Sequence, residues 1–135
     1  MSLEIKESVV EGIGVLALKG RLTVGEASSV REKINEEVAA GRTNVILDLS
    51  HVDYVDSTGL GSMVICFTTL KKAGGVLKLV NPNKRNVELL LLTQLHSVFE
   101  VYTEVADAVN SFFPGREIKR FDILAFVKAH EHDPA

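Results

Sequence analysis

The feature that most constrains the fold is a strand pattern followed closely by a helix pattern in the middle of the chain. Residues 45–49 form a nearly continuous apolar run, which is typical of a strand covered on both faces. Apolar residues then recur at helical spacing, at Leu60, Met63, Val64 and Phe67. The segment Asp56-Ser57-Thr58-Gly59 lies between the two patterns. Ser57 is therefore expected near the surface, where a short loop after the strand gives way to a helix.

The same alternation of strand and helix patterns covers most of the chain. A hairpin is predicted from a strand at residues 5–10, a turn at Gly12 and Gly14, and a strand at 15–18 that ends at Gly20. Further strands are predicted at residues 45–49, 76–80 and 98–102, and helices at 27–38, 57–73, 84–93 and 105–113. This order predicts an α/β domain whose mixed β-sheet combines parallel pairing with an antiparallel hairpin and has about four flanking helices.

Two finer expectations concern the helices. The charged residues of the first helix are expected on its solvent face: Arg31, Glu32, Lys33, Glu36 and Glu37. The run of leucines from Leu89 to Leu92 makes the third helix apolar on most sides, so this helix is expected to pack deeply.

Pro114-Gly115 marks the expected end of the domain. Residues 1–115 are predicted to form the domain, and residues 116–135 a C-terminal extension that is either helical or partly disordered. We expect the extension to be dispensable for folding. His130, His132 and Asp133 lie near its end, where a frayed tail is favoured over a metal site.

Composition excludes several classes of function. A net charge of −3 gives no global reason to expect nucleic-acid binding. No apolar run approaches the roughly 20 residues that span a bilayer, and the charged residues Glu4, Lys6 and Glu7 interrupt any secretory signal. A cytoplasmic location is expected if the source is bacterial. The single Cys66 cannot form an internal disulfide and is interpreted as a core residue.

The residues around Ser57 match no common catalytic motif. A hydrolase nucleophile elbow needs a glycine two residues before the serine, where this chain has Val55, and nothing in the sequence orients His51 or His96 as a base. His51 is expected in the surface loop before Ser57. No phosphate-binding loop motif is present. The carboxylates that could hold Mg²⁺ are spread along the chain, and their spacing does not place them together: Asp48, Asp53 and Asp56.

Two interpretations of Ser57 remain open on the residues alone. Serine is favoured as a helix cap. Alternatively, the free amides and positive dipole end of the helix make this position a suitable place for an added phosphate.

The stretch Asp48-Leu49-Ser50-His51-Val52-Asp53-Tyr54-Val55-Asp56-Ser57-Thr58-Gly59-Leu60-Gly61 closely resembles the signature of STAS domains, the anti-sigma-factor antagonist family. Segments 18–22, 73–77, 91–95 and 98–102 add to a resemblance that covers roughly residues 3–113. The resemblance implies no catalytic activity and no cofactor. It implies that Ser57 is phosphorylated by a partner kinase that is also an anti-sigma factor. Asp56, Thr58 and Gly59 match the family positions around this serine.

The resemblance also implies a partner surface. Arg21 and Thr23, from the loop earlier in the chain, are expected to form its exposed rim and to complete it together with the Asp56–Gly59 segment. Many family members have an aspartate soon after the glycine matched by Gly20, whereas this chain has Leu22-Thr23. Kinase choice or efficiency is therefore expected to differ here.

The main functional hypothesis is a non-enzymatic binding module that sequesters an anti-sigma factor with serine kinase activity and so frees a sigma factor. Phosphorylation adds about −1.5 to −2 charge, and a buried unpaired charge costs several kcal/mol, so one phosphate could release the partner. A serine phosphatase is a further candidate partner, and a homodimer stays open. The alternatives are a scaffold subunit of a bacterial stress-signalling complex and a STAS domain that binds a lipid or small molecule.

Overall fold

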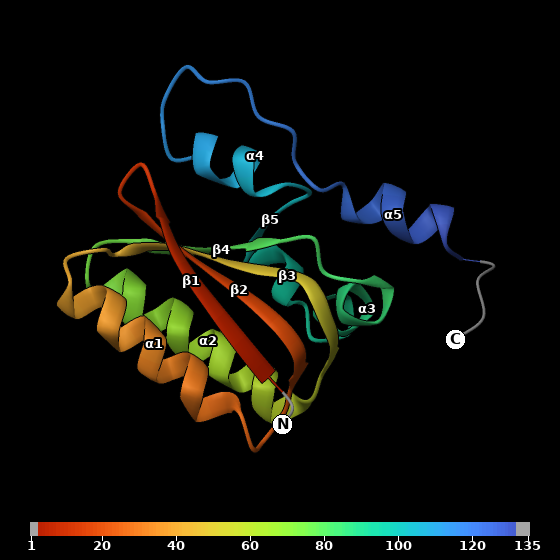
Figure 1. Ribbon diagram of the computed structural model, residues 1–135. Helices are drawn as coiled ribbons and strands as arrows, with labels where there is room; N and C mark the ends of the chain where they lie inside the picture. The colour runs from red at the N-terminus through yellow and green to blue at the C-terminus, as the bar shows by residue number, and fades with distance from the viewer. Residues whose placement is uncertain (1–2, 132–135) are drawn as a thin grey trace.

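Five strands form one sheet in the computed structural model, which describes residues 3–131 (Figure 1). The strands are β1 (Leu3–Val10), β2 (Ile13–Leu22), β3 (Asn44–Val55), β4 (Val76–Val80) and β5 (Glu100–Tyr102). They lie side by side in chain order, β1-β2-β3-β4-β5. The β1–β2 pair is antiparallel and the other three pairs are parallel. The predicted mixed sheet with an N-terminal hairpin is therefore confirmed.

The helices that connect the parallel strands pack on one face of this sheet, because right-handed crossovers between strands in chain order place them there. The other face is covered by a helix that follows the last strand. The helices are α1 (Ala27–Ala39), α2 (Ser57–Lys72), α3 (Lys84–Leu92), the 3-10 turn η1 (Leu95–Ser97), α4 (Val105–Asn110) and α5 (Ile123–Ala129). Figure 1 shows α1 and α2 side by side on one face and α4 on the opposite face. Among residues 3–131, no helix has both the length and the apolar character needed to cross a membrane.

The side chains of the sheet form two apolar layers, because alternate strand residues point to opposite faces. The larger layer packs under α1 and α2 and includes Leu16, Leu47 and Leu79, which are fully buried. The smaller layer lies under α4 and includes Ile46, Val80 and Tyr102. Cys66 belongs to the larger layer, which confirms its interpretation as a core residue.

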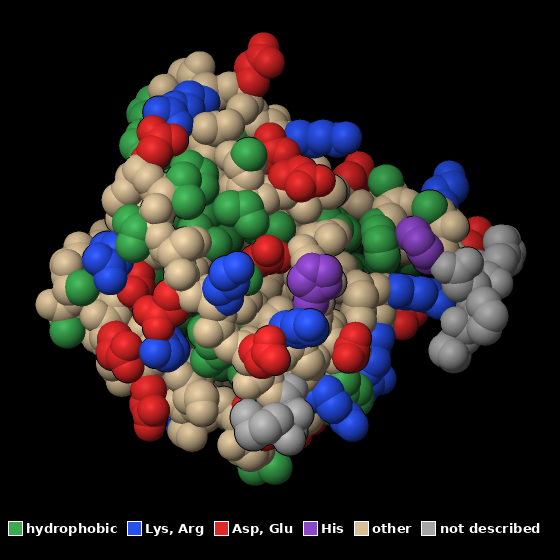
Figure 2. Space-filling model, in the orientation of Figure 1, with side chains coloured by type: hydrophobic (Ala, Val, Ile, Leu, Met, Phe, Trp, Pro, Cys, Tyr) green, Lys and Arg blue, Asp and Glu red, His purple; other side chains and the backbone are tan. Residues whose placement is uncertain are grey.

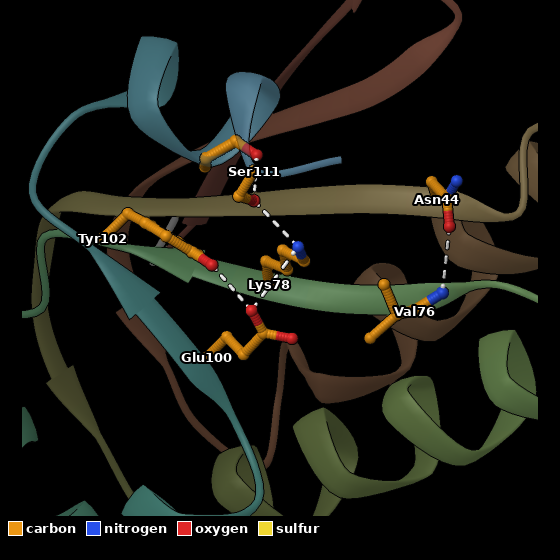
Figure 3. Close-up of polar contacts among 7 residues, drawn as sticks. Asn44, Val76, Lys78, Glu100, Tyr102 and Ser111 are labelled. Carbon is orange, nitrogen blue, oxygen red and sulfur yellow. Dashed lines mark hydrogen bonds and ion pairs between the residues drawn. The ribbon is translucent and has the colours of Figure 1, made fainter. Parts of the chain in front are cut away.

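A buried lysine joins the smaller layer to α4 (Figure 3). Lys78 on β4 is 5% exposed, and its Nζ donates to Ser111 Oγ at 2.8 Å. The same Nζ lies 3.5 Å from Glu100 Oε1 and 4.1 Å from the centre of the Phe112 ring. Tyr102 Oη donates to Glu100 Oε1 at 2.6 Å. The ion pair, the hydrogen bonds and the ring contact compensate for removing the ammonium group from water.

Two strands extend further than their apolar runs predict. β2 continues through Gly20 to Leu22, and β3 continues through residues 50–55, which were expected to form a loop. The two extensions pair with each other, with Gly20 opposite Val52 and Leu22 opposite Val55. The register shifts within this pairing, which breaks the alternation that marks a strand in the sequence. His51 therefore lies on a strand and not in a loop. In contrast, β5 and α4 are shorter than predicted.

Glu37 was expected in the solvated face of α1, but it is buried, with 3% of its surface exposed. Arg42 makes a two-pronged contact with its carboxylate, from Nε to Oε1 at 2.9 Å and from Nη2 to Oε2 at 3.0 Å. The carboxylate lies over Gly14 of β2, where a Cβ atom would overlap it. The prediction was wrong because the partners of Glu37 lie outside α1. Similarly, Leu92 of α3 is 83% exposed, so the apolar run of α3 is not buried on all sides.

Residues 116–131 lie against the rest of the chain. Arg116 makes two hydrogen bonds of 2.9 Å with Glu11 in the hairpin turn. The Phe121 amide donates to the Val101 carbonyl at 3.1 Å, next to an isolated bridge between Arg120 and Tyr102. Phe121 and Ile123 pack against the larger apolar layer. Figure 1 shows α5 beside α3.

Candidate functional site

Ser57 is an exposed residue at the edge of the sheet where parallel strands end. It follows β3 after a single residue, and it is the first residue of α2. β2 ends beside it, because the Asp56 amide donates to the Leu22 carbonyl at 3.2 Å. Ligand and partner sites of open α/β sheets commonly lie at this edge, where the loops from neighbouring strands converge.

Asp56, and not Ser57, caps the helix. Its Oδ1 accepts a hydrogen bond from the Gly59 amide at 2.7 Å, and its Oδ2 accepts one from the Val24 amide at 3.2 Å. Asp56 has extended backbone angles, as expected of an N-cap residue. The interpretation of Ser57 as the cap is therefore wrong by one residue. Within residues 3–131 the Ser57 hydroxyl has no hydrogen-bond partner, so it is free to react.

Gly59 brings the first turn of α2 into contact with the end of β2. A Cβ atom on Gly59 would lie 2.2 Å from the Leu22 carbonyl oxygen, so only glycine fits without a backbone shift. One turn later, the buried Ser62 Oγ donates to the Ala27 carbonyl at 2.8 Å. These contacts hold the loop between β2 and α1 against the helix start.

The structure brings Thr23 to this helix start but gives its hydroxyl another partner. Thr23 Oγ1 donates to Glu26 Oε1 at 2.7 Å, and the Thr23 carbonyl accepts from the Glu26 and Ala27 amides. Thr23 therefore shapes the loop that Asp56 holds through Val24. Thr58 is exposed beside Ser57, whereas Ser62 is buried. The residues predicted at positions 23 and 56–59 thus lie together.

Arg21 lies on β2, and its guanidinium stacks on the ring of Tyr54, with Cζ 4.8 Å from the ring centre. Arg85, from the start of α3, stacks on the same ring at 4.0 Å. Tyr54, Arg85 and Val24 also lie here but were not predicted from the sequence. Val24 is 72% exposed. The contact pairing Arg21 with Tyr54 depends on the shifted strand register. The one sequence signal for these residues is Val24 itself, an apolar residue in a short loop of otherwise polar residues and glycine.

The environments of His51 and Cys66 bear on whether either could take part in catalysis. His51 is exposed on β3, and no contact brings it to Ser57 within the described part of the chain. Burial raises the pKa of the Cys66 thiol to about 11, so this thiol stays protonated at neutral pH. Residues 3–131 contain no cluster of three or more His, Cys, Asp or Glu side chains that could hold a metal ion. His132 and Asp133 lie outside the described residues.

The chain is similar to anti-sigma-factor antagonists of bacteria. The family model of the STAS domain matches residues 4–108. The anti-sigma-B factor antagonist of Bacillus subtilis is 36% identical over 84 residues, which cover 62% of this chain and 76% of that protein.

Solved structures agree with this match. The anti-sigma factor antagonist from Mycobacterium paratuberculosis superimposes with a TM-score of 0.70 at 25% identity, covering 82% of this chain and 93% of that one. The phosphorylated form of the Bacillus cell fate determinant SpoIIAA shares the fold, with a TM-score of 0.63 at 21% identity over 82% of this chain and 99% of that one.

Proposed function

Because the chain belongs to the STAS domain family, we propose that it is an anti-sigma-factor antagonist whose partner binding is switched by phosphorylation of Ser57. One observation carries the proposal. Ser57 is exposed at the first position of α2, and its hydroxyl is unengaged because Asp56 does the capping. The chain would bind an anti-sigma factor with serine kinase activity and thereby free a sigma factor in the cytoplasm. It would have no catalytic activity of its own, and a serine phosphatase would reset it.

The proposed partner surface comprises Arg21, Thr23, Asp56, Ser57, Thr58 and Gly59. Unmodified Ser57 is small and neutral, so it can be buried in an interface. A phosphate there would be favoured by the amides and dipole of α2. However, it would lie beside the Asp56 carboxylate and would have to lose its hydration in the complex. A loss of about 3 kcal/mol would weaken binding more than 100-fold, since each 1.4 kcal/mol is tenfold.

The acceptor assignment is tested by incubating the chain with the cognate kinase and ATP, followed by mass spectrometry. Ser57→Ala should abolish labelling and leave the fold intact, because the Ser57 side chain makes no contact that the fold needs. Thr58→Ala is the matched control, since Thr58 is the exposed hydroxyl next to Ser57, and this variant should still be labelled. Phosphate on Thr58 in the Ser57→Ala chain would refute the assignment.

The switch is tested separately by calorimetry of the unmodified, phosphorylated, Ser57→Asp and Ser57→Ala chains with the partner. The Ala variant should bind at least as tightly as the unmodified chain. Ser57→Asp should weaken binding less than phosphate does, because aspartate has less charge and fewer acceptor oxygens. If the phosphorylated chain binds as tightly as the Ala variant, Ser57 is not a release switch.

A further inference from the structure

The geometry points to a phosphoryl-binding pair of arginines, Arg21 and Arg85, which Tyr54 holds beside Ser57. The inference deepens the proposed function. The phosphoryl group has two candidate sources, and only the first of them rests on the proposed function. These sources are a phosphate on Ser57 of the same chain and a phosphoryl group presented by another molecule.

The two arginines come from separate elements and meet on one ring. Arg21 of β2 is paired with Tyr54 on the neighbouring strand β3, and Arg85 belongs to the first turn of α3. Their Cζ atoms lie 4.8 Å and 4.0 Å from the centre of the Tyr54 ring. Both arginines are exposed, whereas Tyr54 is half-buried.

The start of α3 is fixed to the end of β3, which sets the position of Arg85. Asn83 caps α3 and also donates from Nδ2 to the carbonyls of Val52 and Asp53, at 3.2 Å and 3.1 Å. Asn86 Nδ2 donates to the Val52 carbonyl at 3.1 Å. These three side-chain bonds anchor the turn that carries Arg85 to the strand that carries Tyr54.

Within the described part of the chain, neither guanidinium has an anionic partner. Among residues 3–131, no carboxylate lies within 4.0 Å of Arg21 or Arg85, and no residue accepts a hydrogen bond from either side chain. A contact with the face of a ring uses no hydrogen-bond acceptor, so the N–H donors of each guanidinium remain available. Those donors match the oxygens of a phosphoryl group in a two-pronged contact.

Arg21 and Tyr54 lie on the two strand ends that adjoin Ser57. Tyr54 and Ser57 are three residues apart, so their Cα atoms are separated by at most about 11 Å. Arg21 directly precedes Leu22, whose carbonyl accepts the Asp56 amide at 3.2 Å. The Asp56 carboxylate accepts two backbone amides, and among residues 3–131 it makes no ion pair within 4.0 Å with either arginine.

The test uses a chain that carries phosphoserine at position 57, installed during translation so that no kinase is needed. A ³¹P NMR titration then reports the second pKa of the phosphate. We expect this pKa to be about one unit lower than in the Arg21→Gln/Arg85→Gln variant, because nearby positive charge favours the dianion. Arg31→Gln is the matched control and should leave the pKa unchanged, since Arg31 lies on α1 with no recorded ion pair or ring contact among residues 3–131.

A second arm tests the external source. Inorganic phosphate is added to the unmodified chain, and the NMR signals of the arginine Nε–H groups are followed. The ligand is a phosphoryl group from another molecule if two results are found together. The Nε–H signals of Arg21 and Arg85 shift more than that of Arg31, and the phosphate pKa in the phosphoserine chain is the same with and without the two arginines. Tyr54→Leu should abolish the response in whichever arm shows it, whereas Tyr54→Phe, which keeps the ring, should preserve it.

No response in either arm would overturn the inference. That result would not bear on kinase labelling of Ser57, which is measured independently. Conversely, a chain that no kinase labels could still show the arginine response.

Discussion

At the scale of single residues, Gly59 shows most clearly how the site constrains the sequence. Gly59→Ala should destabilise the fold by about 1–3 kcal/mol, because the added methyl meets the fixed Leu22 carbonyl. Gly61→Ala is the matched control in the same helix. Its methyl would have no neighbour within 4 Å, so alanine should stabilise α2 by up to about 1 kcal/mol. Urea unfolding followed by circular dichroism measures both, and equal effects would contradict the close approach.

Cys66 gives a second prediction at this scale. Its pKa of about 11 and its burial keep the thiol protonated and shielded. At pH 8 the folded chain should react slowly with a thiol reagent such as DTNB, and addition of urea should release one fast-reacting thiol. Immediate stoichiometric reaction of the folded chain would show that this part of α2 opens easily.

At the scale of elements, the C-terminal extension changes an expectation. The sequence indicates that residues after 115 are dispensable, but Phe121 packs on the larger apolar layer and lies 5.1 Å from Phe126, ring centre to ring centre. Phe121→Ala should therefore lower the free energy of unfolding by about 2 kcal/mol, less than for a fully buried phenylalanine. Leu124 of α5 is 77% exposed, and Leu124→Ala should change it by less than about 0.5 kcal/mol. Indistinguishable thermal unfolding of the two variants would support a dispensable extension.

At the scale of the whole molecule, two carboxyl groups connect distant parts of the chain. The hydrogen bond from Arg116 lowers the pKa of Glu11 and ties the extension to the hairpin. Burial opposes ionisation of Glu100, but hydrogen bonds and charge from Tyr102 and Lys78 outweigh it, so the pKa of Glu100 is also lowered. A carboxyl whose pKa is lower in the folded state than in the unfolded state stabilises the folded state at pH values above its ordinary pKa of 4.5. This stabilisation is lost as the pH falls through the lowered pKa.

The free energy of unfolding should therefore fall as the pH is lowered from about 5 to 3. The Glu11→Gln/Glu100→Gln variant should show a flatter dependence in this range, because glutamine does not titrate. Urea unfolding at several pH values measures the difference. Parallel curves for the two chains would mean that these carboxyl groups do not couple folding to pH. The face shown in Figure 2 has acidic and basic side chains side by side. The test therefore concerns the contacts of Glu11 and Glu100 and not repulsion within a surface of one charge.

Local sequence patterns predict the element order, the mixed sheet and the position of Ser57 at the start of a helix. These features depend on local periodicity, since apolar spacing separates strands from helices and glycine or proline marks their ends. The apolar side of α2 was likewise readable, with Leu60 and Met63 buried as expected. Local patterns suffice to predict the buried side of a helix, because residues three and four positions apart lie on the same side.

Which distant residues meet depends on how the segments pack in the fold. The burial of Glu37 depends on Gly14 and Arg42, and the stacking of Arg21 on Tyr54 depends on register shifts between β2 and β3. Asp56 also accepts the amide of Val24, which belongs to the distant loop after β2. The periodicity of one segment carries no information about its register against another, because register is set by packing and hydrogen bonding between segments. The polar partners around Ser57 therefore emerged only with the fold.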